Sequence, residues 1–125
     1  MLNMSIRTEL ILSGILGFIG VALGAFGAHS FKNALLELGT LESYKTGIEY
    51  HLIHAVVLLA IAISGRYEFA SAYLFILIGI ILFSFSLYFY ALFKIKFFVF
   101  ITPIGGVSFL IGWALIVWEA LKLKI

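Results

Sequence analysis

With 125 residues, of which 64% are hydrophobic and only 11% charged, the chain is too apolar for a soluble domain of its size, which is about 45–50% apolar and about 25% charged. The net charge of +2 is small and its carriers are scattered, which excludes a nucleic-acid-binding groove, and the absence of cysteine excludes disulfides and thiol chemistry. The sequence therefore predicts an all-α integral membrane protein, crossed by apolar helices of about 20 residues.

The first predicted span is the apolar run 10–28, whose 19 residues are enough to cross a bilayer. This run is longer than the apolar core of a cleavable signal peptide, about 7–15 residues, so we expect the protein to retain it. Small residues recur along it every three or four positions and form one helical stripe, which lets a neighbouring helix approach closely. The stripe consists of Ser13, Gly17, Gly20, Gly24 and Ala28. We expect the neighbouring helix to belong to the same chain.

The segment 31–38 is expected to form a short amphipathic helix on the membrane surface, because its apolar residues share one helical face. Gly39 and Thr40 then mark the end of that helix and the start of the next. The second span is expected at 45–64. Its purely apolar part, 52–64, has only 13 residues and is too short to cross a bilayer alone.

The third and fourth spans are expected at 69–93 and 97–121, and both are strongly apolar. The fourth contains the sequence "TPIGG" at 102–106, which either kinks the helix or unwinds it into a transporter-like binding site, and we favour the kink. Gly105 and Gly112 give this span a small-residue stripe of its own. Tight loops make successive spans antiparallel, so the sequence predicts one domain, 1–125, folded as an up-down-up-down four-helix bundle.

Threading these spans through a bilayer brings most of their polar residues into one leaflet, and leaves the opposite half almost pure hydrocarbon. Ionisable groups inside a membrane normally face the bundle or a wet cavity. The residues predicted to line a ligand-binding pocket are His29, Glu49, Tyr50, His54, Tyr88 and Thr102.

Two interpretations of this polar cluster stay open. In the first, His29, Glu49, His51 and His54 form a metal or proton site. In the second, the side chains satisfy one another, backbone carbonyls and interfacial water. We predict no catalytic residue, because nothing resembles an activated nucleophile, and neither a bound metal nor a cofactor.

Four stretches read together resemble one small four-span bacterial membrane family, known as domain of unknown function 423, which is similar to eukaryotic transmembrane protein 256. They are "ALGAFGAHSFK" (22–32), "TGIEYHLIHA" (46–55), "LFSFSLYFYAL" (82–92) and "ITPIGGVSFLIGWAL" (101–115). The resemblance covers nearly the whole chain and implies a multi-pass protein of the bacterial plasma membrane, without implying a reaction. The family pattern has a glutamine-like residue at the position of His51, which weakens a metal site built on His51 and His54.

The function expected from these observations is that of a small membrane module without enzymatic activity, which binds a lipid or solute or has a structural role. Its expected partners are membrane lipids and, as an option, a second copy of the chain. The alternative is a subunit of an oligomeric transporter or channel, and a metal-dependent membrane enzyme is the third hypothesis. Lysine and arginine divide four against four between the two sides, so the positive-inside rule gives a tie. We expect both termini in the cytoplasm.

Overall fold

A computed structural model describes residues 3–125, and every regular element in that range is a helix. Four spans are long and apolar enough to cross a membrane: α1 (Ile6–Ala28), α3 (Leu41–Ser64), the composite third span (Tyr67–Phe93) and α6 (Phe97–Lys122). A short helix, α2 (Lys32–Leu38), connects α1 to α3. The predicted all-α fold, with four spans and a short helix between the first two, is confirmed.

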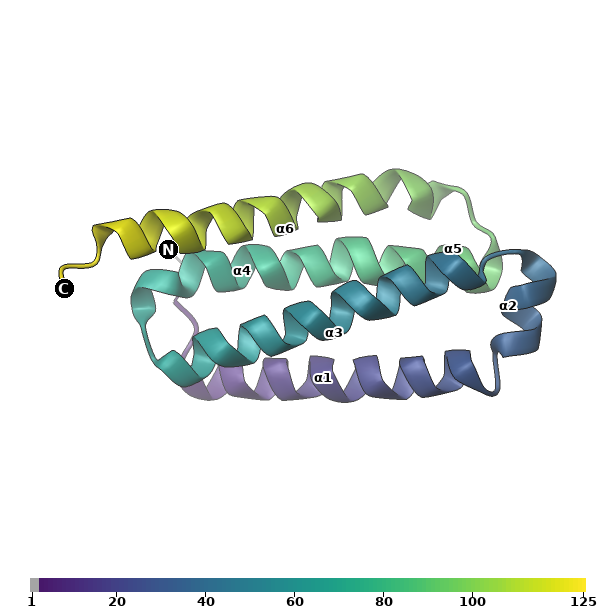
Figure 1. Ribbon diagram of the computed structural model, residues 1–125, viewed down its shortest axis with the longest axis horizontal. Coiled ribbons are helices and arrows are strands. Elements are labelled where there is room, and N and C mark those ends of the chain that lie inside the picture. The colour runs from purple at the N-terminus through teal and green to yellow at the C-terminus, as the bar shows by residue number, and fades with distance from the viewer. Residues whose placement is uncertain (1–2) are drawn as a thin grey trace.

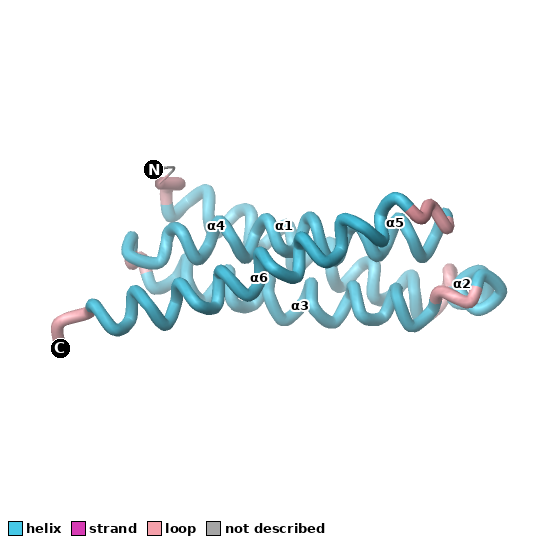
Figure 2. Tube along the Cα trace, turned by 90° about the horizontal axis from the view of Figure 1, so that it is seen from above, coloured by secondary structure: helices cyan, strands magenta, loops and turns pink. Residues whose placement is uncertain are grey.

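The four spans lie side by side along the long axis of the molecule (Figures 1 and 2). Both termini and the turn between α3 and the third span lie at one end, which we call the terminal end, and α2 lies at the other, which we call the α2 end. α1 packs against α3, whereas α6 packs against the third span. α1 and α6 are therefore on opposite sides of the two central spans (Figure 1).

Helix ends follow the local chemistry of the sequence. Ser5 precedes α1 and its hydroxyl accepts a hydrogen bond from the backbone N–H of Thr8 at 3.2 Å, which is the usual N-cap arrangement. Gly39 ends α2 with φ of 70°, and Gly65 ends α3 with φ of 63°. Glycine is favoured at both positions because other residues are strained in the left-handed region.

The third span is not one uniform α-helix. It begins with a 3-10 turn, η1 (Tyr67–Phe69), and continues as α4 (Ala70–Gly79). A π-helical segment, η2 (Ile80–Phe85), then leads into α5 (Ser86–Phe93). Such segments are rare and tend to mark functional or closely packed sites.

α6 crosses the π-helical segment at very short range, through Gly105. A Cβ atom added there would lie 2.6 Å from the carbonyl carbon of Leu82 and would also meet the backbone of Phe83. Further along the same interface, a Cβ atom on Gly112 would lie 2.6 Å from Cγ1 of Ile76. These two glycines let α6 and the third span pack almost backbone to backbone.

Part of the small-residue stripe of α1 faces α3. A Cβ atom on Gly20 would lie 2.7 Å from Cδ2 of Leu52, and one on Gly24 would lie 3.4 Å from Cγ2 of Ile48. Gly17 has no atom within 4 Å of the corresponding position, and Ala28 is exposed. The tight contact thus involves only part of the predicted stripe. Gly27, which the stripe did not include, packs against the ring of Tyr44.

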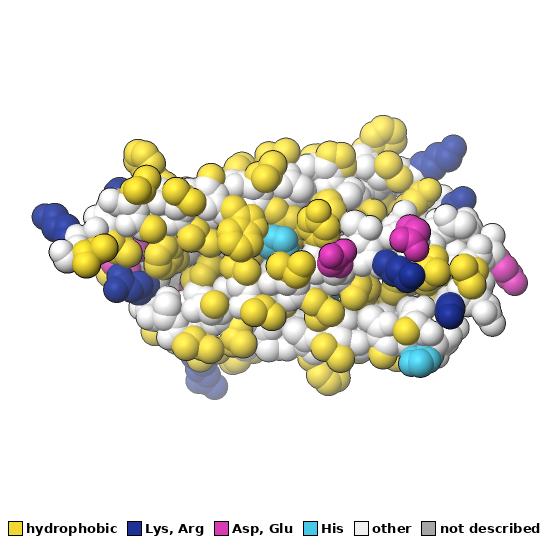
Figure 3. Space-filling view, in the orientation of Figure 1, with side chains coloured by type: hydrophobic (Ala, Val, Ile, Leu, Met, Phe, Trp, Pro, Cys, Tyr) yellow, Lys and Arg dark blue, Asp and Glu magenta, His cyan; other side chains and the backbone are white. Residues whose placement is uncertain are grey.

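α6 stays helical through Pro103. The unwound alternative for the sequence at 102–106 is therefore wrong for this structure. On the face that Figure 3 shows, the outward side chains are mostly apolar, and charged side chains lie mainly towards the two ends. This distribution fits a protein whose middle contacts lipid and whose ends contact headgroups and water.

Candidate functional site: a charged cavity at the terminal end

The structure does not gather the six residues predicted to bind a ligand into one pocket. His29 is the exposed C-cap residue of α1, at the α2 end. Glu49 and Tyr50 are exposed on α3, and the Tyr50 ring stacks near His54 with centroids 6.1 Å apart. Tyr88 and Thr102, the remaining two, take part in separate hydrogen bonds between helices.

His54 uses both ring nitrogens to bind other parts of the bundle. Its Nδ1 lies 2.6 Å from the backbone oxygen of Tyr50, and its Nε2 lies 3.0 Å from Nε1 of Trp113 on α6. A carbonyl oxygen only accepts, and an indole N–H only donates. The imidazole of His54 therefore carries a single hydrogen, on Nδ1, and is neutral.

His51 is fully buried and binds two further elements. Its Nε2 lies 2.7 Å from the backbone oxygen of Leu16 on α1, and its Nδ1 lies 2.8 Å from the hydroxyl of Tyr88 on α5. Nε2 must donate to the carbonyl, so in the neutral ring Nδ1 accepts from Tyr88. His51 and His54 thus adopt opposite tautomers, and His51 links three helices.

These bonds leave no ring nitrogen of either histidine free to bind a metal ion. Within residues 3–125 no group of three or more potential metal-binding side chains is close enough to hold one. The geometry favours the second interpretation, in which the ring nitrogens of His51 and His54 bond to backbone carbonyls and side chains of the bundle rather than to a metal. Sequence reasoning gave His51 too little weight, because only the structure shows that its ring packs against α1 at Gly20.

Hydroxyl groups complete the pattern of bonds between helices in the α2 half. The Ser86 hydroxyl lies 2.6 Å from that of Thr102 and connects α5 to α6. Thr40 donates to the backbone oxygen of Ala91 at 2.6 Å. In a bilayer such bonds stabilise helix association because water is not there to compete for the same groups.

The prediction that the opposite half is almost pure hydrocarbon is wrong. The Tyr73 hydroxyl donates to the backbone oxygen of Glu9 at 2.7 Å and lies 3.0 Å from the Ser13 hydroxyl. Tyr73 is fully buried, and the exposed fraction of Glu9 is only 8%. From the sequence, Tyr73 was included only as part of the apolar span 69–93, but its hydroxyl requires a partner once it is buried.

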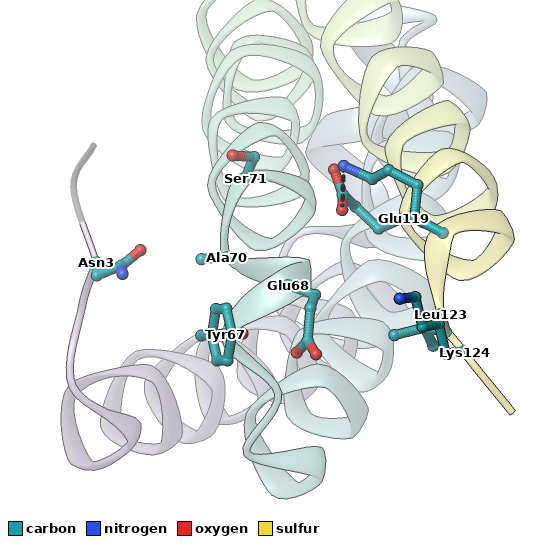
Figure 4. A pocket seen from close by; sticks show the side chains of 9 residues that line it. Asn3, Tyr67, Glu68, Ala70, Ser71, Glu119, Leu123 and Lys124 are labelled. Atoms are coloured by element: carbon teal, nitrogen blue, oxygen red, sulfur yellow. Dashed lines mark ion pairs between the residues drawn. The ribbon is translucent and has the colours of Figure 1, made fainter.

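Two polar cavities lie at the terminal end. The larger has a volume of about 570 Å³, within the range of about 300–1,000 Å³ typical of ligand sites. Its polar lining residues come from the N-terminal segment, the start of the third span and the end of the chain: Asn3, Tyr67, Glu68, Ser71, Glu119, Lys122 and Lys124. Figure 4 shows Asn3 and Tyr67 on one side of this space and Glu119 and Lys124 on the other.

The charges around this larger cavity are of both signs. Lys122 forms an ion pair with Glu119 at 2.8 Å, and both side chains remain partly accessible. Lys122 also lies 5.9 Å from the ring centroid of Trp118, which is exposed on α6. Exposed tryptophan and lysine at the end of a span are typical of the membrane–water boundary.

The smaller cavity has a volume of about 270 Å³ and is lined by Ser5, Glu9 and Arg66 among others. It shares Asn3, Tyr67 and Ala70 with the larger one, so the two adjoin. We refer to the two together as the terminal cavity.

Three further cavities, of about 250, 260 and 190 Å³, are lined largely by apolar side chains. None of these five cavities is lined by His29, Glu49, Tyr50 or His54. No site at the terminal end was predicted from the sequence. The signal available was that three distant segments, around Glu9, Glu68 and Lys122, return to the same end of an up-down-up-down bundle.

Comparison with known proteins identifies the family. The family model described as "Protein of unknown function (DUF423)" matches residues 23–106. The chain belongs to the DUF423 family. The sequence resemblance to domain of unknown function 423 is thereby confirmed, and this DUF423 protein is a multi-pass membrane protein of uncharacterised function.

The curated relatives of this DUF423 chain match over almost its full length. The UPF0382 inner membrane protein YgdD of Escherichia coli (strain K12) is 42% identical over 127 residues, covering 97% of this chain and 95% of YgdD. A UPF0382 membrane protein of Haemophilus influenzae is 43% identical, covering 92% and 94%. The UPF0382 membrane protein YwdK of Bacillus subtilis is 38% identical, covering 93% and 98%. No solved structure matches.

Proposed function

We propose that this DUF423 protein is a non-catalytic membrane module that holds the headgroup of a phospholipid in the terminal cavity. The observation that carries the proposal is the cavity of about 570 Å³, lined by Lys122 and Lys124 together with carboxylates, at the end of the spans. Arg66 adds a third cation on the adjoining smaller part. Lysine and arginine side chains are the usual partners of lipid phosphates.

Apolar surface beside the cavity supports a lipid rather than a water-soluble ligand. Tyr67 and Leu121 have exposed fractions of 78% each, and Trp118 of 60%. These side chains lie at the same end as the charges, where the acyl chains of a bound lipid would leave the cavity. A phospholipid matches both the charged and the apolar parts of this region.

Since YgdD is named an inner membrane protein, we propose the bacterial inner membrane for this chain as well. With both termini in the cytoplasm, the terminal cavity faces the cytoplasmic leaflet. The cytoplasmic leaflet contains anionic headgroups, which attract basic side chains. In this orientation the basic residues of the cavity therefore lie next to lipids that suit them.

Native mass spectrometry of the protein released from phospholipid nanodiscs tests the proposal. Each basic side chain near the lipid surface contributes about 1 kcal/mol to lipid binding, so the double variant Arg66→Gln/Lys122→Gln should bind lipid roughly 30-fold more weakly. The matched control Lys32→Gln/Lys45→Gln removes two cations from the α2 end and should retain lipid like the wild type. A wild-type protein that emerges without lipid, or equal loss in both variants, would contradict the proposal.

Glu49 and Tyr50 support a second candidate site on the outer face of α3. Both side chains are exposed, and neither makes a side-chain hydrogen bond or ion pair to another described residue. Together with the neighbouring His54 they remain a proposed polar contact for a lipid in the leaflet at the α2 end. The variant Glu49→Gln/Tyr50→Phe, measured in the same way, should lose lipid only if this second site is occupied.

One observation favours the alternative of a transporter or channel subunit. Buried hydrogen-bonding side chains occur in both halves of the bundle, at His51 and Tyr88 and again at Ser13 and Tyr73. A second copy packed against the exposed face of α1 would be needed to extend this into a route. Proton flux into liposomes, abolished by Tyr73→Phe, would favour the transporter; impermeable liposomes would favour the lipid-binding module.

A further inference from the structure

The side chain of Glu9, one turn inside α1, is mostly buried and opens on the terminal cavity, and its carboxylate has no partner among residues 3–125. Its exposed fraction is 8%, and it lines the smaller part of the terminal cavity. Ser13 and Tyr73 both bond to the backbone oxygen of Glu9, not to its side chain. Among residues 3–125 the Glu9 carboxylate has no hydrogen bond and no ion pair.

A carboxylate one turn inside a membrane span needs an explanation, because charges inside membranes normally face a partner or a wet cavity, and Glu9 faces the cavity. Arg66 lines the same small cavity, yet its guanidinium pairs with Glu68, at 4.0 Å. Ser5 also lines the cavity, but its hydroxyl is engaged with Thr8. The cavity therefore presents to a ligand one carboxylate that needs donors and one guanidinium, half exposed, that suits an anion.

We propose that Glu9 binds the primary ammonium of a zwitterionic phospholipid with an ethanolamine-type headgroup, whose phosphate lies against Arg66. This inference rests on the proposed function and names the headgroup that the terminal cavity selects. A primary ammonium offers three N–H donors to a carboxylate. A choline headgroup is cationic without any N–H, and a glycerol headgroup has no cation at all, so neither satisfies Glu9 and Arg66 together.

The volume and position of the smaller cavity agree with this assignment. A headgroup in about 270 Å³ lies one helical turn inside the start of α1, beside the exposed apolar side chains of Ile6 and Tyr67. Glu9 on α1 and Arg66 in the turn after α3 carry opposite charges. The headgroup is therefore oriented with its ammonium at Glu9 and its phosphate at Arg66. Selectivity then follows from the donors of the ammonium, not from net charge.

The test measures lipid retention by native mass spectrometry in nanodiscs that contain equal amounts of phospholipids with identical acyl chains. The headgroups form a series from ethanolamine through its N-methyl and N,N-dimethyl derivatives to choline, with phosphoglycerol added. Wild-type protein should prefer ethanolamine over choline by roughly tenfold or more, the scale of one charge-assisted hydrogen bond. Retention should fall stepwise as N–H groups are replaced by methyl groups, and this result needs no variant that has to fold.

Variants then assign the preference to Glu9. Glu9→Gln should bind all headgroups alike, because the backbone bonds of Glu9 to Ser13 and Tyr73 remain while the charge is lost. Glu37→Gln, which removes an exposed carboxylate of α2 at the other end, should keep the wild-type preference.

The outcomes separate the two proposals. Lipid retained without headgroup preference, or a preference that survives Glu9→Gln, would overturn the role of Glu9 and leave the lipid-binding function standing. No retained lipid on the wild type would overturn the proposed function itself. Binding of water-soluble phosphoethanolamine by the wild type in the absence of retained lipid would overturn the lipid as the source of the headgroup.

Discussion

Replacement of Gly105 by alanine should push α6 away from the third span. The added Cβ atom would lie 2.6 Å from the carbonyl carbon of Leu82 and nearer still to the backbone nitrogen of Phe83, whereas ordinary contact begins at 3.4 Å, so the helices would have to separate by more than about 0.8 Å. The atom it meets belongs to the backbone and has no rotamer to change. A gap of about 0.5–1 Å removes a quarter to a half of the dispersion energy of each contact along the interface. Overpacking of this kind costs about 1–3 kcal/mol.

Gly106→Ala is the matched control, because its Cβ atom would meet nothing closer than 3.8 Å, at Cδ2 of Phe83. Both substitutions gain the same helix propensity, about 1 kcal/mol. Thermal unfolding in one detergent, followed by circular dichroism, should therefore show Gly105→Ala melting below the wild type and Gly106→Ala melting at or above it. Equal melting temperatures for the two variants would refute the close approach of α6 to the π-helical segment.

Three more predictions follow from the buried hydrogen bonds. Imidazole ¹⁵N shifts should show the hydrogen of His54 on Nδ1 and that of His51 on Nε2; the same tautomer for both would contradict the assigned bonds. Tyr88→Phe should lower stability by about 1–3 kcal/mol in detergent unfolding, because it leaves Nδ1 of a fully buried His51 without a donor; an unchanged stability would mean that this bond is absent. Trp113→Phe should cost about 1 kcal/mol by removing the bond to His54, and no further loss is expected from Trp113→Phe in a His54→Phe background.

The spans could be predicted because length and composition alone decide them. An apolar run such as 10–28 has no other stable location than a bilayer, and tight loops leave little choice of topology. The contact of α1 with its neighbour was also readable in part, since Gly20 and Gly24 lie on one helical face and do meet α3. Which small residues make the contact could not be predicted: Gly27, outside the predicted stripe, meets Tyr44, whereas Gly17, inside it, meets no atom within 4 Å.

Burial of individual polar side chains could not be predicted, because it depends on the partner across the interface. The sequence around His29 and His51 does not distinguish their burial. His29 is exposed at a helix end, whereas His51 is fully buried between three helices. The π-helical segment packs against Gly105, at least 20 residues away in the sequence, and no local pattern in 80–85 predicts it. Hydropathy likewise does not predict the hydrogen bonds of the Tyr73 hydroxyl, because it treats tyrosine as an aromatic residue.

The terminal cavity was missed for a different reason. Its charges come from three separate segments, around Glu9, Glu68 and Lys122, and each looks like an ordinary helix-end charge when taken alone. Topology brings them together, but only the packing of the helix ends decides whether they enclose a space. The ligand site at the α2 end was predicted because threading the spans through a bilayer brings most of their polar residues into that leaflet.

Photo-crosslinking with a phospholipid that carries a diazirine in its headgroup tests the central claim most directly. After illumination in liposomes, the modified residues are mapped by tandem mass spectrometry of the digested protein. The account predicts adducts concentrated at 3–9, 66–71 and 119–124, around the terminal cavity, and their loss when excess unlabelled ethanolamine lipid competes. Adducts concentrated instead between His29 and His54, at the α2 end, would contradict it.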